Sequence, residues 1–338
     1  MKKLSIMFTC LACMALSACT TAPASGTNAT TKTATSGNSK TKLSVLYAGS
    51  MTKVMEQSIR PNADSALHVD FQGEGKGSDA LAQMIRSGIS KPDIFISASP
   101  SVNNKDLMGP NNHDLVKWYL TLAQDQLVIA YSPKSKFKNQ LDEAAQGKVP
   151  WYDVLEQKGF QLGRTDPALD PKGTDTLFLF QLASIYYNQP SLESKILGST
   201  ENTKQVFPEE TLLAGLTSGQ MDAIIAYKHE ATEWGVPYIT LPPQLNLGNS
   251  NLASYYKQAT YQTKDGNTET GAPIVFTITI PTTTSHKRQA EDFVKYMVTG
   301  DGHTQLIHDG FTPISTQIAG NRSSVPSSLQ SIIQGTLK

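Results

Sequence analysis

Cysteine is nearly absent from this chain of 338 residues, and its three cysteines, Cys10, Cys13 and Cys19, all lie close to the start. The chain beyond them therefore has no disulfide, no cysteine nucleophile and no thiolate metal site. Because covalent cross-links are missing, the folded part must draw its stability from hydrophobic cores. The chain is long enough for two lobes of ordinary domain size.

Net charge and long apolar runs are lacking as well. The 29 basic and 29 acidic residues balance, which leaves no electrostatic footprint for nucleic acid or an anionic membrane surface. After residue 19 no apolar stretch is long enough to cross a bilayer. We therefore expect no nucleic-acid partner and no membrane-spanning segment in the body of the protein.

Motifs of the common enzyme classes are also missing. The chain has no G-x-S-x-G elbow and no Walker loop, and GEGKGS at 73–78 lacks the Walker spacing. The six histidines are scattered and form no HExxH pattern, which argues against a zinc site. These absences predict a protein that is not an enzyme and carries no cofactor.

An export signal is present at the start of the chain. Lys2 and Lys3 precede a short apolar run, and Leu-Ser-Ala at 16–18 leads into Cys19. This pattern is typical of a secretory signal peptide. Its end resembles a bacterial lipobox, in which Cys19 becomes the lipidated first residue. We expect a signal peptide at 1–19 and an exported protein, lipid-anchored at the outer face of the cytoplasmic membrane or on its periplasmic side.

A polar segment follows this signal. Residues 20–42 are almost entirely Thr, Ser, Ala, Gly, Asn and Lys. Such a composition cannot bury enough apolar area to offset the entropy lost on ordering. We interpret the segment as a disordered tether between a lipid anchor and the body.

Strands and helices alternate from Leu43 onward. Apolar runs at Leu43–Tyr47, Leu67–Gln72 and Asp93–Ser97 predict strands, with helical spacing between them. This βαβαβ order is typical of a parallel sheet whose ligands bind beyond the carboxyl ends of the strands.

Two stretches predict the crossings between lobes. Leu127–Tyr131 has the pattern of a strand leaving the first lobe, and Val275–Ile280 that of a returning strand. The prediction is a two-lobed α/β fold with the ligand cleft between the lobes. Lobe 1 is expected to span 43–130 and 270–338, and lobe 2 to span 131–269.

Four junctions of a loop with a helix stand out as candidate ligand loops. Ser50 and Ser78 each follow a strand and precede a helix, as N-cap residues do, and helices also open at 173–174 and 208–209. Helix N-termini carry free N–H groups and a positive dipole end. Several of them aimed at one cleft would bind an anion, with serine hydroxyls as further donors.

Five segments carry a family resemblance. They are YAGSM at 47–51, GKGSDALAQMI at 75–85, KPDIFISAS at 91–99, GRTDPALDPKG at 163–173 and SGQMDAIIAYKHEA at 218–231. Together they resemble the molybdate/tungstate-binding proteins of ABC importers, most of all the branch found widely in archaea. The resemblance implies a type II periplasmic-binding-protein fold. It also implies a monomer that captures a tetrahedral oxyanion, molybdate or tungstate, and delivers it to a membrane permease.

The resemblance also implies roles for single residues. Ser50 and Ser78 match serines that donate to oxyanion oxygens, Lys172 matches a position that uses its backbone N–H, and Tyr227 matches a tyrosine whose hydroxyl contacts an oxygen. In the archaeal-type branch an Asp and a Glu also bind the metal itself, at the positions of Asp170 and Glu209. The chain departs from that branch at Lys172 and Thr174, where Cys and Tyr are usual, and these departures bear on six-coordination of the metal.

Carboxylates in such a cleft need a physical reason. A carboxylate facing a dianion at 4 Å is repelled by about 4 kcal/mol per unit charge pair at an effective dielectric constant near 20. Asp170 and Glu209 fit the cleft if they ligate the metal, accept a proton from the ligand, or pair with a cation. Arg164 and Lys172 are the candidate cations.

Each candidate residue also has an alternative role that is purely structural. Ser50 and Ser78 could be simple helix caps, and Asp170 a turn residue. Glu209 could complement a helix dipole, and Tyr227 could pack at a strand end.

Three other functions are alternatives to molybdate or tungstate binding. Sulfate or phosphate is the alternative ligand of the same cleft. More remote alternatives are a ferric-ion site at the adjacent tyrosines 186–187 or 255–256, and a lipid-anchored hydrolase that uses Ser50. The hydrolase would need a base beside that serine, and no histidine is near it in sequence.

Overall fold

The computed structural model describes residues 40–264 and 266–337. The predicted signal peptide, Cys19 and nearly all of the predicted tether lie outside the described residues. The first strand begins at Thr41, two residues before the predicted start of lobe 1. No helix within these described ranges is long and apolar enough to cross a membrane.

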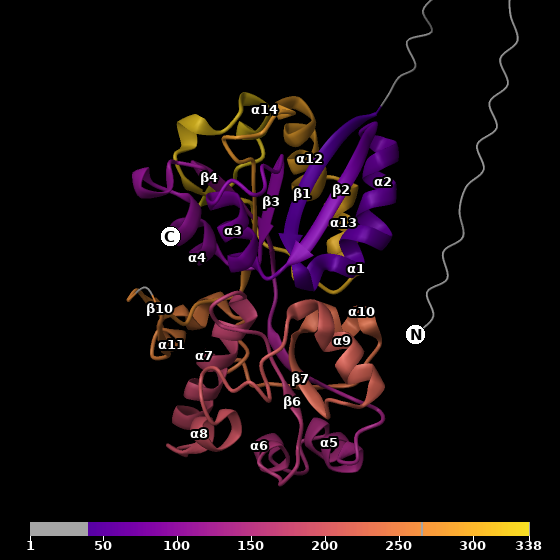
Figure 1. Ribbon diagram of the computed structural model, residues 1–338, viewed down its shortest axis with the longest axis vertical. Helices are drawn as coiled ribbons and strands as arrows, with labels where there is room; N and C mark the ends of the chain where they lie inside the picture. Colours follow the sequence, from indigo (N-terminus) through magenta and orange to yellow (C-terminus); the bar gives the residue numbers. More distant parts are fainter. Residues whose placement is uncertain (1–39, 265, 338) are drawn as a thin grey trace, which may run out of the picture. The chain divides into compact units, whose positions relative to one another are not determined.

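The larger of the two main sheets has seven strands in the order β13-β12-β4-β11-β3-β1-β2 (Figure 1). β1 runs parallel to β2 and β3, as the predicted βαβαβ order requires, whereas β11 is antiparallel to β3 and β4. The strands are β1 (Thr41–Ala48), β2 (Val69–Lys76), β3 (Ile94–Ser97), β4 (Trp118–Gln124), β11 (Val275–Thr279), β12 (Gln317–Gly320) and β13 (Gly335–Thr336).

The smaller sheet has four strands in the order β6-β7-β5-β8, and a separate hairpin pairs β9 with β10. Its members are β5 (Leu127–Tyr131), β6 (Leu162–Gly163), β7 (Ala223–Tyr227) and β8 (Tyr238–Thr240); the hairpin consists of β9 (Thr260–Gln262) and β10 (Thr268–Thr270). β5 lies wholly in this sheet, so the chain passes between sheets at residues 125–126, a few residues before the predicted lobe boundary at 130.

Helices surround each sheet in two separate groups (Figure 1). Around the larger sheet lie α1 (Thr52–Val54), α2 (Arg60–Ala66), α3 (Ser78–Arg86), α4 (Pro100–Val102), α12 (Lys287–Thr299), α13 (Asp301–His308) and α14 (Ser327–Gln330). With the smaller sheet lie α5 (Lys138–Ala145), α6 (Trp151–Leu155), α7 (Pro171–Tyr186), α8 (Leu192–Leu197), α9 (Glu209–Ser218), α10 (Lys228–Trp234) and α11 (Ala253–Tyr256).

Short 3₁₀ and π segments connect or extend these helices. The 3₁₀ segments are η1 (Gly49–Met51), η4 (Pro110–Asn112), η5 (Ser250–Leu252) and η6 (Arg322–Ser324), and the π segments are η2 (Met55–Ile59) and η3 (Asn103–Leu107).

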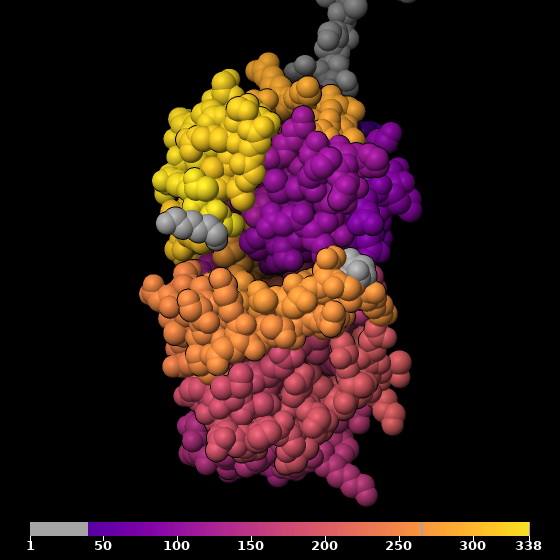
Figure 2. Space-filling model, turned by 90° about the vertical axis from the view of Figure 1, so that its left-hand side faces the viewer, coloured from indigo at the N-terminus to yellow at the C-terminus, as the bar shows by residue number. Residues whose placement is uncertain are grey.

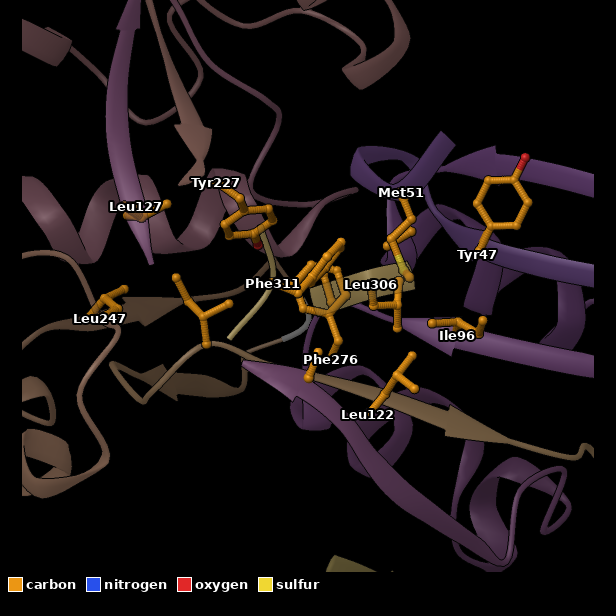
Figure 3. Packing of buried hydrophobic residues seen from close by; sticks show 14 of the residues in the cluster. Tyr47, Met51, Ile96, Leu122, Leu127, Tyr227, Leu247, Phe276, Leu306 and Phe311 are labelled. Carbon is orange, nitrogen blue, oxygen red and sulfur yellow. The ribbon is translucent and has the colours of Figure 1, made fainter. Parts of the chain in front are cut away.

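The hydrophobic core is continuous from one sheet to the other (Figure 3). Phe276, on the returning strand β11, contacts the ring of Tyr227 from the smaller sheet at 5.5 Å between centroids. It contacts Phe311 at 5.2 Å on its other side. Burial of such large rings is the main source of stability in a chain without cross-links.

Two boundaries next to the candidate loops differ from the prediction. β2 extends to Lys76 in register with β1, so most of GEGKGS is strand and Gly77 alone separates it from α3. Helix α7 begins at Pro171, two residues before the predicted opening at 173–174. A proline is suited to the first turn of a helix, and Asp170 caps it, which together fix the earlier start.

Candidate functional site

Ser50 lies in η1, directly after β1. Its side chain is buried, and its Oγ has no hydrogen-bond partner among the described residues. The N-cap of η1 is Ala48, with no side-chain capping bond. The alternative in which Ser50 only caps a helix is therefore wrong, because its hydroxyl makes no capping bond.

Ser78 is the first residue of α3, after the N-cap residue Gly77. Its Oγ accepts a hydrogen bond from the N–H of Ala98, at 3.1 Å, beyond the end of β3. The capping alternative is wrong here too, because the side chain bonds a neighbouring strand end. As an acceptor in this bond, the hydroxyl keeps its own proton for donation.

Asp170 caps helix α7. Its Oδ1 accepts from the backbone N–H of Lys172 at 2.8 Å and from the hydroxyl of Thr165 at 3.2 Å. The N–H of Lys172, which the resemblance assigns to the ligand, is thus already used within the protein. Burial, together with the charge of Glu209, raises the pKa of Asp170 to about 7, with Lys172 opposing.

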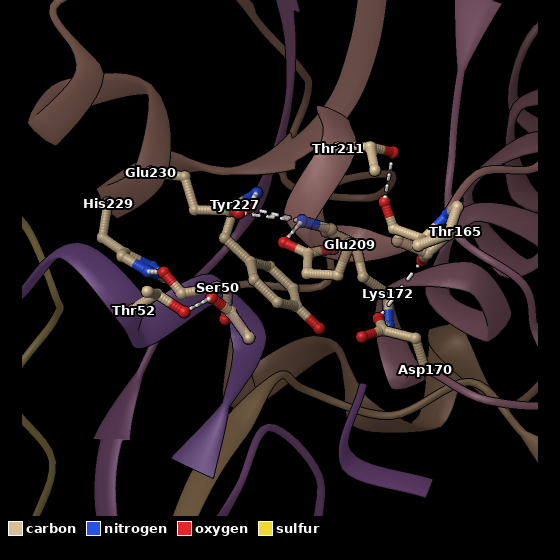
Figure 4. Close-up of polar contacts among 12 residues, drawn as sticks. Ser50, Thr52, Thr165, Asp170, Lys172, Glu209, Thr211, Tyr227, His229 and Glu230 are labelled. Carbon is tan, nitrogen blue, oxygen red and sulfur yellow. Dashed lines mark hydrogen bonds and ion pairs between the residues drawn. The ribbon is translucent and has the colours of Figure 1, made fainter. Parts of the chain in front are cut away.

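The side chain of Lys172 lies at the centre of a buried ion cluster (Figure 4). Its Nζ is 2.7 Å from Oε1 of Glu209 and 2.9 and 2.8 Å from the two carboxylate oxygens of Glu230. Burial by itself lowers the pKa of Lys172, but the charges of these carboxylates more than offset it, so the pKa is raised. Lys172 stays an ammonium at neutral pH.

Glu209 is the first residue of α9 and is buried. One oxygen bonds Lys172, while Oε2 has no hydrogen-bond partner in the described part of the chain. A Cβ placed on Gly49 would lie 2.7 Å from Cγ of Glu209, so the loop that carries Ser50 packs directly on this side chain. Glu209 therefore does more than complement a helix dipole.

Tyr227 lies at the end of β7, with its ring in the core. Its hydroxyl donates to Oδ2 of Asp175 at 3.1 Å. The hydroxyl of Tyr227 thus bonds a carboxylate in this structure. The alternative in which Tyr227 packs at a strand end fits its buried ring. The ring also lies 5.3 Å from the ammonium of Lys172, within cation–π range.

Sequence reasoning missed Glu230 and Asp175. Glu230 stands three residues after Tyr227 and accepts its N–H at 2.7 Å, as in a capping box. That spacing is the sequence signal that could have found it. The prediction of Arg164 as a cation for Asp170 or Glu209 is wrong. Its guanidinium donates instead to the carbonyls of Ser199 and Thr200 and to the side chain of Gln205.

The loops of the two sheets touch across the cleft. The N–H of Ala80 donates to the carbonyl of Leu169 at 3.1 Å. On the other side Nε2 of His229 lies 3.1 Å from the carbonyl oxygen of Ser50. At these two points the loops of the larger sheet touch those of the smaller one, and the cleft between them is closed.

Two cavities flank this closed region. One, of about 220 Å³, is lined by Gly77, Asp170 and Glu209, among others. The other, of about 580 Å³, reaches Ala98 and Asp175 and extends under the β9–β10 hairpin. Figure 2 shows the orange segment that includes this hairpin running across below the purple lobe.

The remote alternatives do not fit these side chains. Nε2 of His229 contacts the carbonyl oxygen of Ser50, whereas the Oγ has no base beside it, which argues against a hydrolase. The ring of Tyr187 packs on Tyr152, at 4.6 Å between centroids, and the hydroxyl of Tyr256 donates to a backbone carbonyl. Across the described ranges no group of three or more His, Cys, Asp or Glu side chains could hold a metal ion.

Comparison with known proteins places the chain. Residues 43–312 match the family described as bacterial extracellular solute-binding protein. The chain belongs to this family. A putative ABC transporter molybdenum-binding protein of Haloferax volcanii is 33% identical over 262 residues, covering 78% of this chain and 80% of that protein. The molybdate/tungstate-binding protein WtpA of Pyrococcus abyssi is 29% identical over 291 residues, covering 79% and 83%.

Solved structures confirm the two-lobed fold of periplasmic binding proteins. The periplasmic molybdate-binding protein of Azotobacter vinelandii superposes with a TM-score of 0.54 at 17% identity, covering 81% of this chain and all of that one. The predicted fold class and family resemblance are thus confirmed. By this family the protein is an extracellular solute-binding protein, which is an exported class.

Proposed function

We propose that the protein binds molybdate or tungstate in the cleft between Ser50, Ser78, Asp170 and Glu209 and delivers it to an ABC permease. The observation that carries this proposal is a pair of buried, unpartnered groups, Oγ of Ser50 and Oε2 of Glu209. They come from opposite lobes and lie on touching loops. Unpaired buried polar groups are costly unless a ligand completes their hydrogen bonds or ligation.

The chemistry of the donors agrees with an oxyanion of a large metal. Hydroxyls of Ser50 and Ser78 donate to oxygens, while Asp170 and Glu209 are proposed to ligate the metal atom itself. A metal centre that expands its coordination turns the carboxylates from repelling groups into ligands. Sulfate and phosphate offer no such centre, so they are the weaker candidates for this cleft.

The mechanism we propose is capture by closure. Each lobe supplies part of the donor set, so the ligand binds the closed arrangement better than an open one and shifts the population toward it. The closed form then docks on the permease. Lipidation at Cys19 is proposed to keep the protein at the membrane, and Cys19→Ser should release it into the soluble fraction.

Calorimetric titration of residues 20–338 tests the ligand. Molybdate, tungstate, sulfate, phosphate and ferric citrate are added in separate runs. We expect tight binding of molybdate and tungstate and no heat with sulfate. Asp170→Asn and Glu209→Gln should each weaken the two metal oxyanions about tenfold or more. Tight sulfate or phosphate binding would instead identify that anion as the cargo.

A further inference from the structure

The family resemblance gives a role only to the backbone N–H of Lys172, but the side chain of this residue lies among buried carboxylates. Its ammonium is buried, with 1% of the side chain exposed, and it contacts three carboxylate oxygens within 2.9 Å. A buried lysine with this many acidic partners is fixed in position, since each bond restrains it from a different direction.

Glu230 is the second acidic partner of the Lys172 ammonium, besides Glu209. Both of its oxygens contact Nζ of Lys172, and Oε2 also accepts the backbone N–H of Tyr227 at 2.7 Å. Glu230 is fully buried on helix α10. It is therefore part of the framework and does not face a ligand.

Glu209 is held on its other side by the same ammonium. Oε1 bonds Lys172, Cγ packs against the Gly49 loop, and Oε2, which is also buried, has no hydrogen-bond partner among the described residues. Lys172 thus holds one oxygen of Glu209 and leaves the other oxygen without a bond inside the protein.

We infer that Lys172 is a positioning residue for the ligand carboxylate Glu209. Its ammonium, anchored by Glu230, directs Oε2 of Glu209 toward the metal of the oxyanion and supplies a positive charge where a carboxylate and a dianion would otherwise repel. The inference rests on the proposed function, because it gives Lys172 a role toward that same ligand.

The test replaces the anchored cation together with Glu230, and leaves Glu209 as the carboxylate whose partner is lost. Lys172→Met alone would leave Glu230 unpaired in the interior, which destabilises a protein strongly. The double variant Lys172→Met with Glu230→Gln removes both charges, keeps side-chain volume and keeps an acceptor for the N–H of Tyr227. Lys138→Met is the matched control, because Lys138 pairs with Asp142 of the same helix, α5, and both side chains are partly exposed.

Two readouts are needed for each folded variant, calorimetric affinity for tungstate and the number of oxygen neighbours of tungsten by X-ray absorption. We expect the double variant to bind tungstate roughly 30-fold or more weakly, with fewer oxygen neighbours than in the wild type. The control should match the wild type in both. Thermal melts without ligand report whether each variant is folded.

Other outcomes separate the two proposals. A folded double variant with unchanged affinity and unchanged oxygen neighbours overturns the role of Lys172. The same role is overturned if wild-type tungsten has only four oxygen neighbours, although oxyanion binding then stands. If the wild-type protein binds neither tungstate nor molybdate, the proposed function itself fails.

Discussion

Ser50 differs from the other buried serines in the described part of the chain, because its hydroxyl has no hydrogen-bond partner there. Ser97 and Ser135 donate to a carbonyl and to Asp222, while Ser78 and Ser132 accept backbone N–H groups. Burying a hydroxyl without a partner costs about 1–3 kcal/mol in proteins. Such a cost at one position, in a loop that closes on the opposite lobe, is what a ligand contact would offset.

Ser50→Ala therefore separates affinity from stability. We expect the variant to be as stable as the wild type without ligand, since no hydrogen bond is lost, and to bind molybdate about tenfold more weakly. Adding Ser78→Ala should abolish binding. Ser135→Ala is the control, expected to lose stability through its 2.6 Å bond to Asp222 and to keep its affinity. Full-strength binding by the double variant would mean that the site is misplaced.

Glu233 on helix α10 predicts a pH effect on stability. Both of its carboxylate oxygens lack a partner among the described residues, and burial raises its pKa from 4.5 to about 7, opposed by the charge of His229. The folded state therefore holds this proton more tightly than the unfolded chain. Its stabilising effect is complete below pH 4.5 and is lost as the pH rises through 7.

Glu233→Gln should remove that loss. At pH 8 we expect the variant to exceed the wild type in unfolding free energy by about 1–3 kcal/mol, while at pH 4.5 the two should agree. Urea unfolding at both pH values measures the difference. Parallel pH curves for the two proteins would show that Glu233 ionises freely in the folded state.

At the scale of elements, the junction of β7 with α10 links the crossing point to the ligand loop. His229 contacts Asp125, which lies between β4 and β5, through Nδ1 and the carbonyl of Ser50 through Nε2. Its ring also stacks on Phe311 at 3.8 Å between centroids. The two polar contacts therefore join His229 to the crossing segment and to the loop of Ser50.

His229→Phe keeps the stacking and removes the two polar contacts. We expect a loss of about 2–3 kcal/mol in unfolding free energy and several-fold weaker tungstate binding, because the Ser50 loop loses its anchor to the opposite lobe. Denaturant unfolding and calorimetry measure the two effects. His308→Phe serves as the control on an exposed ring, and equal behaviour of both variants would remove His229 from the closure.

How far the sequence predicts these elements depends on the range of the interactions. Buried strands such as Ile94–Ser97 and Leu127–Tyr131 are continuous apolar runs, and their positions followed from that pattern. The ligand loops followed from strand ends and family motifs. The partners of Lys172 did not, because Glu209 and Glu230 lie 37 and 58 residues away and only the packing of α7, α9 and α10 brings them together.

At the scale of the whole molecule, function depends on how closely the two lobes approach. The two lobes approach closely where Gly77, directly after β2, meets the segment before α7. A Cβ on Gly77 would lie 2.3 Å from the carbonyl oxygen of Leu169, and both groups belong to the backbone. Closure therefore requires glycine at this point, although the φ angle of −50° suits any residue.

Gly77→Ala should act as a wedge between the lobes. The added methyl group meets the backbone of Leu169 and no core side chain, so we expect the thermal stability without ligand to change little. Tungstate affinity should fall about tenfold or more, because the closed state is blocked. Small-angle X-ray scattering should show the wild-type radius of gyration shrinking when tungstate is added and that of the variant staying constant. Gly335→Ala is the control: a Cβ on Gly335 would lie 3.6 Å from its nearest neighbour, Cγ of Gln317, so this variant should behave as the wild type. A variant that still contracts and binds at full strength would show that ligand capture does not need the contact between Gly77 and Leu169.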